Sequence, residues 1–230
     1  MGAQITLIQQ SDALPRWCKL WQQVGASSAP EPLFEQIVGA YSEPHRAYHT
    51  LAHLEDCLIK WEAARSLAHQ PNIVELAIYF HDVIYDPRAF DNEERSAALA
   101  VQWLQCGQVP QSLVEAVRQL ILATKHQSTP KDEDTALLVD IDLAILGSPI
   151  AEFDRYETNI RYEYSWVPEA IYREKRASLL KQFLDRSPLF QTDFFHHQYE
   201  QQARYNLHRS LQRLNSSTGS WLSSFESKSR

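Results

Sequence analysis

The feature that most constrains the fold is an apolar run that ends on an acid. Residues 72–80 read NIVELAIYF, and His81 and Asp82 follow directly. We expect this segment to form a helix that begins after Gln70-Pro71 and ends near Asp86-Pro87, because the residue before a proline disfavours the helical region. A bare carboxylate is costly to bury unless a cation lies nearby. Upstream, His49 and His53 are four residues apart in a stretch with helical spacing, which predicts that their imidazoles share one helix face. Because neutral imidazoles do not neutralise a carboxylate, these residues predict a divalent metal ion shared by two helices.

The rest of the chain reads as a succession of amphipathic helices. Apolar residues recur at helical spacing between Pro- and Gly-containing breaks, and the sequence shows neither sustained alternation nor Asn-Gly turns. The run LLVDIDLAIL at 137–146 could form a short strand, but helix is favoured because no partner strand is found. We therefore predict an all-α fold, a single globular helical bundle over residues 1–215, with a disordered tail over residues 216–230.

Composition limits the classes of function. The chain has 230 residues, of which 44% are hydrophobic and 22% charged, as in globular proteins that bury a core. The net charge of −7 argues against a general nucleic-acid or anionic-membrane surface. Cys18, Cys57 and Cys106 are widely spaced and are interpreted as reduced core residues. No signal segment or membrane-spanning run is recognised, so the expected location is cytoplasmic.

Two further carboxylates, Asp140 and Asp142, lie in the most apolar segment of the second half. On a helix they point to nearly opposite sides, so only one of them can face a given metal ion. The residues three and four positions from Asp142 are all aliphatic, and the apolar lining of Asp140 is slightly thinner. We expect Asp142 to be the more buried residue and the ligand, with Asp140 as the alternate.

The order His53, His81-Asp82, Asp142 resembles the HD superfamily of metal-dependent phosphohydrolases. Members of that superfamily carry one His on an early helix, a His-Asp doublet on the next and a distant Asp. The segment from Tyr48 also resembles the Tyr-His-Asn-x-x-His segment of cyclic-nucleotide phosphodiesterases, with Thr50 in place of the Asn. A closer similarity is to a group of bacterial predicted HD phosphohydrolases. It includes the segments YHxxxH, FHDxxYDP, NEExSA, ATKH and DxDLAILG.

The resemblance implies an HD-type helical domain that binds one or two divalent ions, with Mn, Fe, Co, Ni, Zn and Mg as the choices. The implied ligands are His53, His81, Asp82 and Asp142. If Asp82 bridges to a second ion, His126 is a further ligand. The competing interpretation of His126 is a solvated residue at a helix end.

The implied reaction is hydrolysis of a phosphorylated small molecule, such as a phosphomonoester, nucleotide or pyrophosphate, by a metal-activated water. Asp82 would act at the metal, and His49 would protonate the leaving oxygen or orient the water. Arg46, Lys125 and Glu93 are the predicted substrate contacts, Arg46 through a bidentate bond to phosphate. The competing interpretation, which the sequence favours for Lys125 and Glu93, is that they are surface or capping residues. The alternative function is a metal-containing module that senses a nucleotide or acts as a scaffold without turnover.

Overall fold

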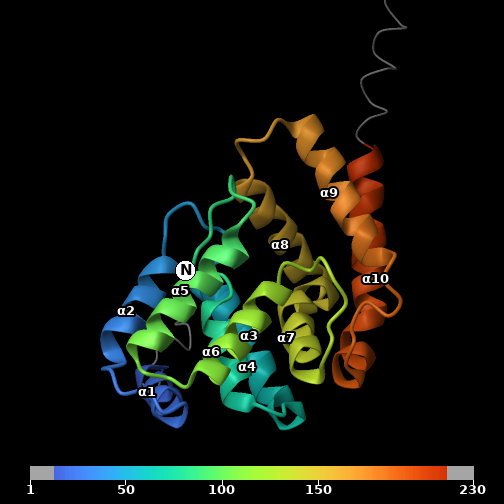
Figure 1. Ribbon diagram of the computed structural model, residues 1–230. Helices are drawn as coiled ribbons and strands as arrows, with labels where there is room; N and C mark the ends of the chain where they lie inside the picture. Colours follow the sequence, from blue (N-terminus) through green and yellow to red (C-terminus); the bar gives the residue numbers. More distant parts are fainter. Residues whose placement is uncertain (1–12, 217–230) are drawn as a thin grey trace, which may run out of the picture. The chain divides into compact units, whose positions relative to one another are not determined.

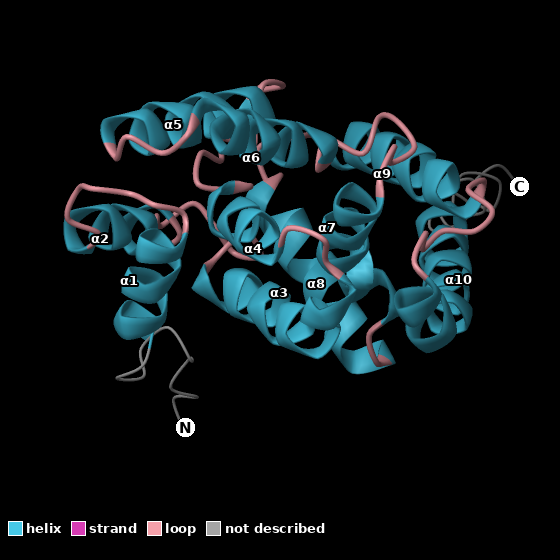
Figure 2. Ribbon diagram, turned by 60° about the horizontal axis from the view of Figure 1, so that its bottom comes forward, coloured by secondary structure: helices cyan, strands magenta, loops and turns pink. Residues whose placement is uncertain are grey.

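The structure is a computed structural model that describes residues 13–216, and its regular secondary structure in this range is helical, with turns and loops between the helices (Figures 1 and 2). Ten α-helices and no strand occur among the described residues. The predicted all-α class is therefore confirmed, and the ambiguous run at 137–146 is helical. Of the predicted tail, only Ser216 is described, and it ends the last helix. Within residues 13–216, none of the helices has the length and apolar character that crossing a bilayer requires.

The helices form two compact units, the first ending at Asp142 and the second beginning at Leu143. The prediction of a single domain over residues 1–215 is not tested by this division and stays a prediction. The helices are α1 (Ala13–Gln23), α2 (Glu31–Ala40), α3 (Leu51–Ala64), α4 (Pro71–Phe80), α5 (Asn92–Cys106), α6 (Gln111–Ala123), α7 (Glu133–Leu143), α8 (Ile150–Glu163), α9 (Glu169–Leu184) and α10 (Asp193–Ser216).

In the first unit, α4 is the central helix. It packs against α1, α3, α5 and α6, and Figure 2 shows α5 and α6 side by side next to it. Every residue from Ile73 to Phe80 is buried, because neighbouring helices cover all sides of α4. The buried acid among them, Glu75, accepts hydrogen bonds from Nε of Arg16 (2.8 Å) and Nε1 of Trp61 (3.0 Å). The apolar run of the sequence is thus the core helix of this unit.

Two helix ends differ from the prediction. We expected the helix with the His-Asp doublet to end near Asp86, but α4 ends at Phe80, so the doublet lies in the turn that follows. The prediction that His49 and His53 share a helix face is wrong, because α3 begins at Leu51 after an extended Thr50. The carbonyl of His49 accepts a hydrogen bond from a side chain, which keeps it out of the helical pattern.

In the second unit, α9 and α10 pack side by side, and the 3-10 turn Ala144–Gly147 packs on α10. The buried Asn206 of α10 donates to the carbonyls of Leu146 and Ser148, both at 2.9 Å. A Cβ atom on Gly147 would lie 2.6 Å from the backbone oxygen of Tyr199, so only glycine allows this close approach.

Candidate metal site

Two histidines and two carboxylates meet in the first unit. His53 is on α3, His81 and Asp82 follow α4, and Asp142 is near the end of α7. The Nε2 atoms of His53 and His81 are 3.1 Å apart. Oδ2 of Asp82 lies 3.1 Å from Nε2 of His81 and 3.5 Å from Nε2 of His53. Oδ1 of Asp142 lies 3.6 Å and 3.3 Å from the same two nitrogens.

These separations match those between neighbouring ligand atoms around one metal ion. With metal–ligand bonds of about 2.1 Å, neighbouring ligand atoms are about 3.0 Å apart at a right angle and about 3.4 Å apart at the tetrahedral angle. The five measured distances run from 3.1 to 3.6 Å. Each of the two carboxylates therefore lies at a ligand-to-ligand distance from both histidine Nε2 atoms.

His81 is held in the orientation that ligation needs. Its Nδ1 lies 2.8 Å from the carbonyl oxygen of Ile78, one helical turn earlier. A carbonyl can only accept, so Nδ1 carries the proton, and the neutral ring keeps a lone pair on Nε2. That lone pair is on the side of Asp82 and Asp142, and a hydrogen bond of this kind also orients metal-bound histidines.

His126 lies beside the site, next to Asp142. Its Nε2 is 3.0 Å from Oδ2 of Asp142, the oxygen that does not face His53 and His81. Because a carboxylate only accepts, His126 donates this hydrogen bond and orients Asp142. The φ angle of His126 is 56°, in the left-handed region that a side chain makes costly. An orienting hydrogen bond accounts for this position, and the predicted ligation of a second ion by His126 stays a prediction.

The thiol of Cys57, interpreted from the sequence as a core residue, also reaches this site. His53, Cys57, His81 and Asp142 offer ligand atoms that all lie within 4.8 Å of one another, close enough to hold a metal ion. Cys57 is buried, and its Sγ lies 3.8 Å from both ring nitrogens of His53. Its position one helical turn after His53 is the sequence signal that could have identified it.

The histidines and carboxylates of the site shift one another's pKa values toward their charged forms. Burial lowers the pKa of His53, but Cys57 and the carboxylates of Asp142 and Asp82 outweigh it and hold the pKa well above its usual range. Burial also lowers the pKa of His81, but Asp82, Tyr41 and Asp142 together outweigh it and hold the pKa well above its usual range. Burial raises the pKa of Asp82 and Asp142, but the neighbouring histidines outweigh it and hold both pKa values well below their usual range. A proton and a metal ion therefore compete for the same place.

The burial of the two acids on α7 is the reverse of what we expected. Asp140 is 0% exposed, whereas the side chain of Asp142 is 16% exposed. Asp142 is nevertheless the carboxylate that faces the histidines, so its place at the cluster does not depend on being the more buried acid.

His49 lies in the turn before α3, beside the cluster. Its ring stacks on Tyr85, with centroids 4.0 Å apart, and lies edge-on to the ring of His53 at 5.9 Å. The structure therefore brings His49 to the site, although by a turn and not by the predicted helix face.

Arg46 has a different environment from the predicted phosphate contact. Its side chain is 0% exposed. The guanidinium donates to the carbonyls of His49, Asp82 and Val83 and to the carboxylate of Glu43. No exposed guanidinium surface is left for a phosphate in this structure.

The other two predicted substrate residues lie around the start of α5. Lys125 pairs with the carboxylate of Glu94 and donates to the carbonyl of Phe90 at 3.0 Å. Glu93 is half-buried, and burial and the charge of Asp82 raise the pKa of Glu93. The charge of Asp82 therefore acts on Glu93, whereas the charge of Lys125 is paired with that of Glu94.

Comparison of the sequence with protein families, with curated proteins and with solved structures finds no match in any of the three.

Proposed function

We propose that this chain is a metal-dependent phosphohydrolase that holds a divalent ion with His53, His81, Asp82 and Asp142. The observation that supports this proposal is the set of five separations, 3.1 to 3.6 Å, among the four ligand atoms. Two nitrogen and two oxygen ligands suit first-row divalent ions such as Mn, Fe, Co, Ni and Zn.

The geometry favours Asp82 over Cys57 as the fourth ligand. The equal distances from Sγ to both nitrogens of His53 place the sulfur midway between them, away from the lone pair of Nε2. An ion about 2.1 Å from Nε2 along that lone pair would lie about 4 Å from Sγ, against about 2.3 Å for a zinc–thiolate bond. Asp82 already faces both Nε2 atoms, whereas Cys57 would have to rotate toward the ion.

When bound, a divalent ion supplies Lewis acidity, which lowers the pKa of a water and offsets the charge that develops on phosphorus. The residues of the chain supply the rest. His126 keeps Asp142 oriented, and Tyr85 fixes the ring of His49 at the edge of the cluster. In the proposal His49 donates a proton to the leaving oxygen. Glu93 accepts a proton from the attacking water.

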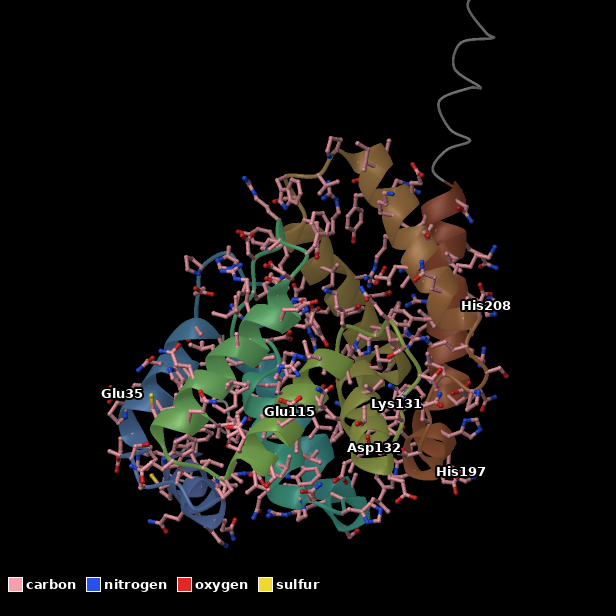
Figure 3. All side chains as sticks on the ribbon, in the orientation of Figure 1. Glu35, Glu115, Lys131, Asp132, His197 and His208 are labelled. Carbon is pink, nitrogen blue, oxygen red and sulfur yellow. The ribbon has the colours of Figure 1, made fainter. Side chains whose placement is uncertain are left out.

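The test is metal analysis of protein purified without chelator, followed by assays on phosphomonoesters, nucleotides and pyrophosphate with each candidate ion. We expect bound metal, turnover of at least one substrate, and loss of metal and turnover in Asp82→Asn and His81→Ala. His197→Ala is the control, because His197 is exposed on α10 (Figure 3). Bound metal without turnover across the panel would favour the sensing or scaffold alternative, and a chain that binds no metal contradicts both.

A further inference from the structure

We infer that Arg46 is a positioning residue that holds the ends of the two ligand-bearing helices, α3 and α4, at the separation the metal ion needs. This inference rests on the proposed function, because it takes His53, His81 and Asp82 as ligands. It gives a buried cation, which the reaction itself does not use, a defined task.

The guanidinium joins the start of one helix to the end of the other. Its Nη1 donates to the carbonyl of His49 (3.1 Å), which lies just before α3, and to the carbonyl of Asp82 (2.7 Å), which lies just after α4. Its Nη2 donates to the carbonyl of Val83 at 3.1 Å. These carbonyls have no place in a helix, so Arg46 supplies the partners that the helices cannot.

Asp82 depends most on this arrangement, because it lies in a turn and has no helix to hold it. Its backbone N–H donates to the hydroxyl of Tyr41 at 3.3 Å, and its carbonyl accepts from Arg46. Both backbone groups of a proposed metal ligand are therefore held by side chains from the segment that precedes α3. A shift of Arg46 would move the carboxylate of Asp82 relative to His53.

The position of the guanidinium is itself closely fixed. It lies over the ring of Tyr41 (5.2 Å to the centroid) and the ring of Tyr85 (5.5 Å), and its Nε donates to Glu43 at 3.0 Å. Arginine can occupy such a place because its planar fork offers donors in several fixed directions and stacks on aromatic rings. Lysine keeps the charge but offers a single donor atom, so Arg46→Lys tests the geometry apart from the charge.

The experiment measures Co²⁺ affinity, by competition with a chelating dye, and the visible spectrum of bound Co²⁺ in the full chain. For Arg46→Lys we expect Co²⁺ binding to weaken by about 10- to 100-fold, as for other residues that orient metal ligands, with a changed Co²⁺ spectrum. The matched control is Arg176→Lys. Arg176 is also buried, and its partners Glu157 and Tyr156 belong to the second unit. We expect this control to lower Tm and to leave the Co²⁺ affinity and spectrum unchanged.

The outcomes separate the two proposals. A wild-type chain that binds no Co²⁺ overturns the proposed function, whereas wild-type affinity and spectrum in a folded Arg46→Lys overturn only the role of Arg46. If Arg46→Lys does not fold, Glu43→Gln decides, because it keeps the guanidinium and weakens one of its anchors at an exposed position. We then expect a several-fold loss of Co²⁺ affinity, and an unchanged affinity overturns the inference.

Discussion

His81 and Asp82 are neighbours in the chain, but different interactions fix them. His81 is bonded to a carbonyl of its own helix, and Asp82 is held by Arg46 and Tyr41. The histidine therefore depends on the secondary structure of α4, and the carboxylate depends on tertiary contacts. Substitutions around the doublet are expected to disturb Asp82 before His81.

The pH dependence of the metal-free chain follows from the shifted pKa values. The pKa values of His53 and His81 are raised, so their stabilisation is complete below the ordinary value of 6.5 and is lost as pH rises through the raised values. Asp82 and Asp142 have lowered pKa values, so their stabilisation is present above the ordinary 3.8 and is lost as pH falls through the lowered values. We expect the metal-free Tm to be highest between these two ordinary values and to fall toward alkaline pH.

Thermal melts over a pH series, with chelator and with saturating Mn²⁺, check this expectation. The ion replaces the protons on the histidines, so the metal-loaded chain should keep its Tm at alkaline pH. If the Tm of the metal-free chain instead increased as the pH rises above the ordinary histidine pKa, the predicted sign would be contradicted.

Replacing Cys57 and Asp82 in turn distinguishes the two possible donor sets. We expect Asp82→Asn to weaken Co²⁺ binding by about 100-fold or more, because it removes a charged ligand. Loss of a residue that only orients a ligand weakens metal binding by about 10- to 100-fold. Cys57→Ala should leave the affinity nearly unchanged. A near-ultraviolet thiolate-to-cobalt band that disappears in Cys57→Ala would show instead that the thiol is a ligand.

At the scale of elements, α7 contacts the residues just before α4 with its first turn and the residues just after α4 with its last turn. Near its start, Asp134 accepts hydrogen bonds from the backbone N–H groups of His69 (2.8 Å) and Gln70 (2.9 Å), just before α4. Near its end, Asp142 faces His81. The contact at Asp134 therefore helps to set the position of Asp142 two helical turns later.

We expect Asp134→Ala to lower the free energy of unfolding by about 1–2 kcal/mol, as for the loss of a helix cap, and to weaken metal binding several-fold. Asp132→Ala is the matched control. Asp132 (Figure 3) bonds to Thr135 within the start of α7, so its loss affects that helix alone. Denaturant unfolding and Co²⁺ titration measure the two effects, and equal Co²⁺ affinities in the two variants would contradict the coupling.

Helical spacing predicted the helices of this chain better than their ends. Periodicity is a local property, and it correctly indicated all-α structure and a central helix that begins near Pro71. The carbonyls just after α4 and just before α3 accept hydrogen bonds from Arg46, and its partner Asp82 lies 36 positions away in the sequence, beyond the reach of local periodicity. The contacts of Arg46 with Asp82 and Val83 were missed for the same reason, whereas local spacing could have shown that Cys57 lies one helical turn after His53. The greater burial of Asp140 was also missed, because local apolar neighbours do not show which side a distant element covers.

At the scale of the whole molecule, the proposed ligands all fall within the first of the two units. Acidic residues outnumber basic residues in 13–142, whereas the two kinds are nearly balanced in 143–216. The negative charge of the chain is therefore concentrated in the part that contains the site, which favours association with a cation.

Binding of an ion at this site should stabilise the native chain. At a free ion concentration about 100 times Kd the gain is about 2.7 kcal/mol, which corresponds to a rise in Tm of about 5–10 °C for a chain of this size. Calorimetry with and without Co²⁺ measures the rise. His53→Ala should abolish it, while the exposed His208→Ala should not (Figure 3), and a rise that persists in His53→Ala would place the ion elsewhere.

The mixed nitrogen and oxygen cluster around His53 and Asp142 also has a practical consequence. Such a set takes up late first-row ions more avidly than early ones, so copper or nickel would displace manganese wherever they are supplied. If the chain binds an ion as proposed, cellular supply would then decide which ion is bound. Protein recovered from a nickel column would carry nickel, whichever ion the site held in the cell.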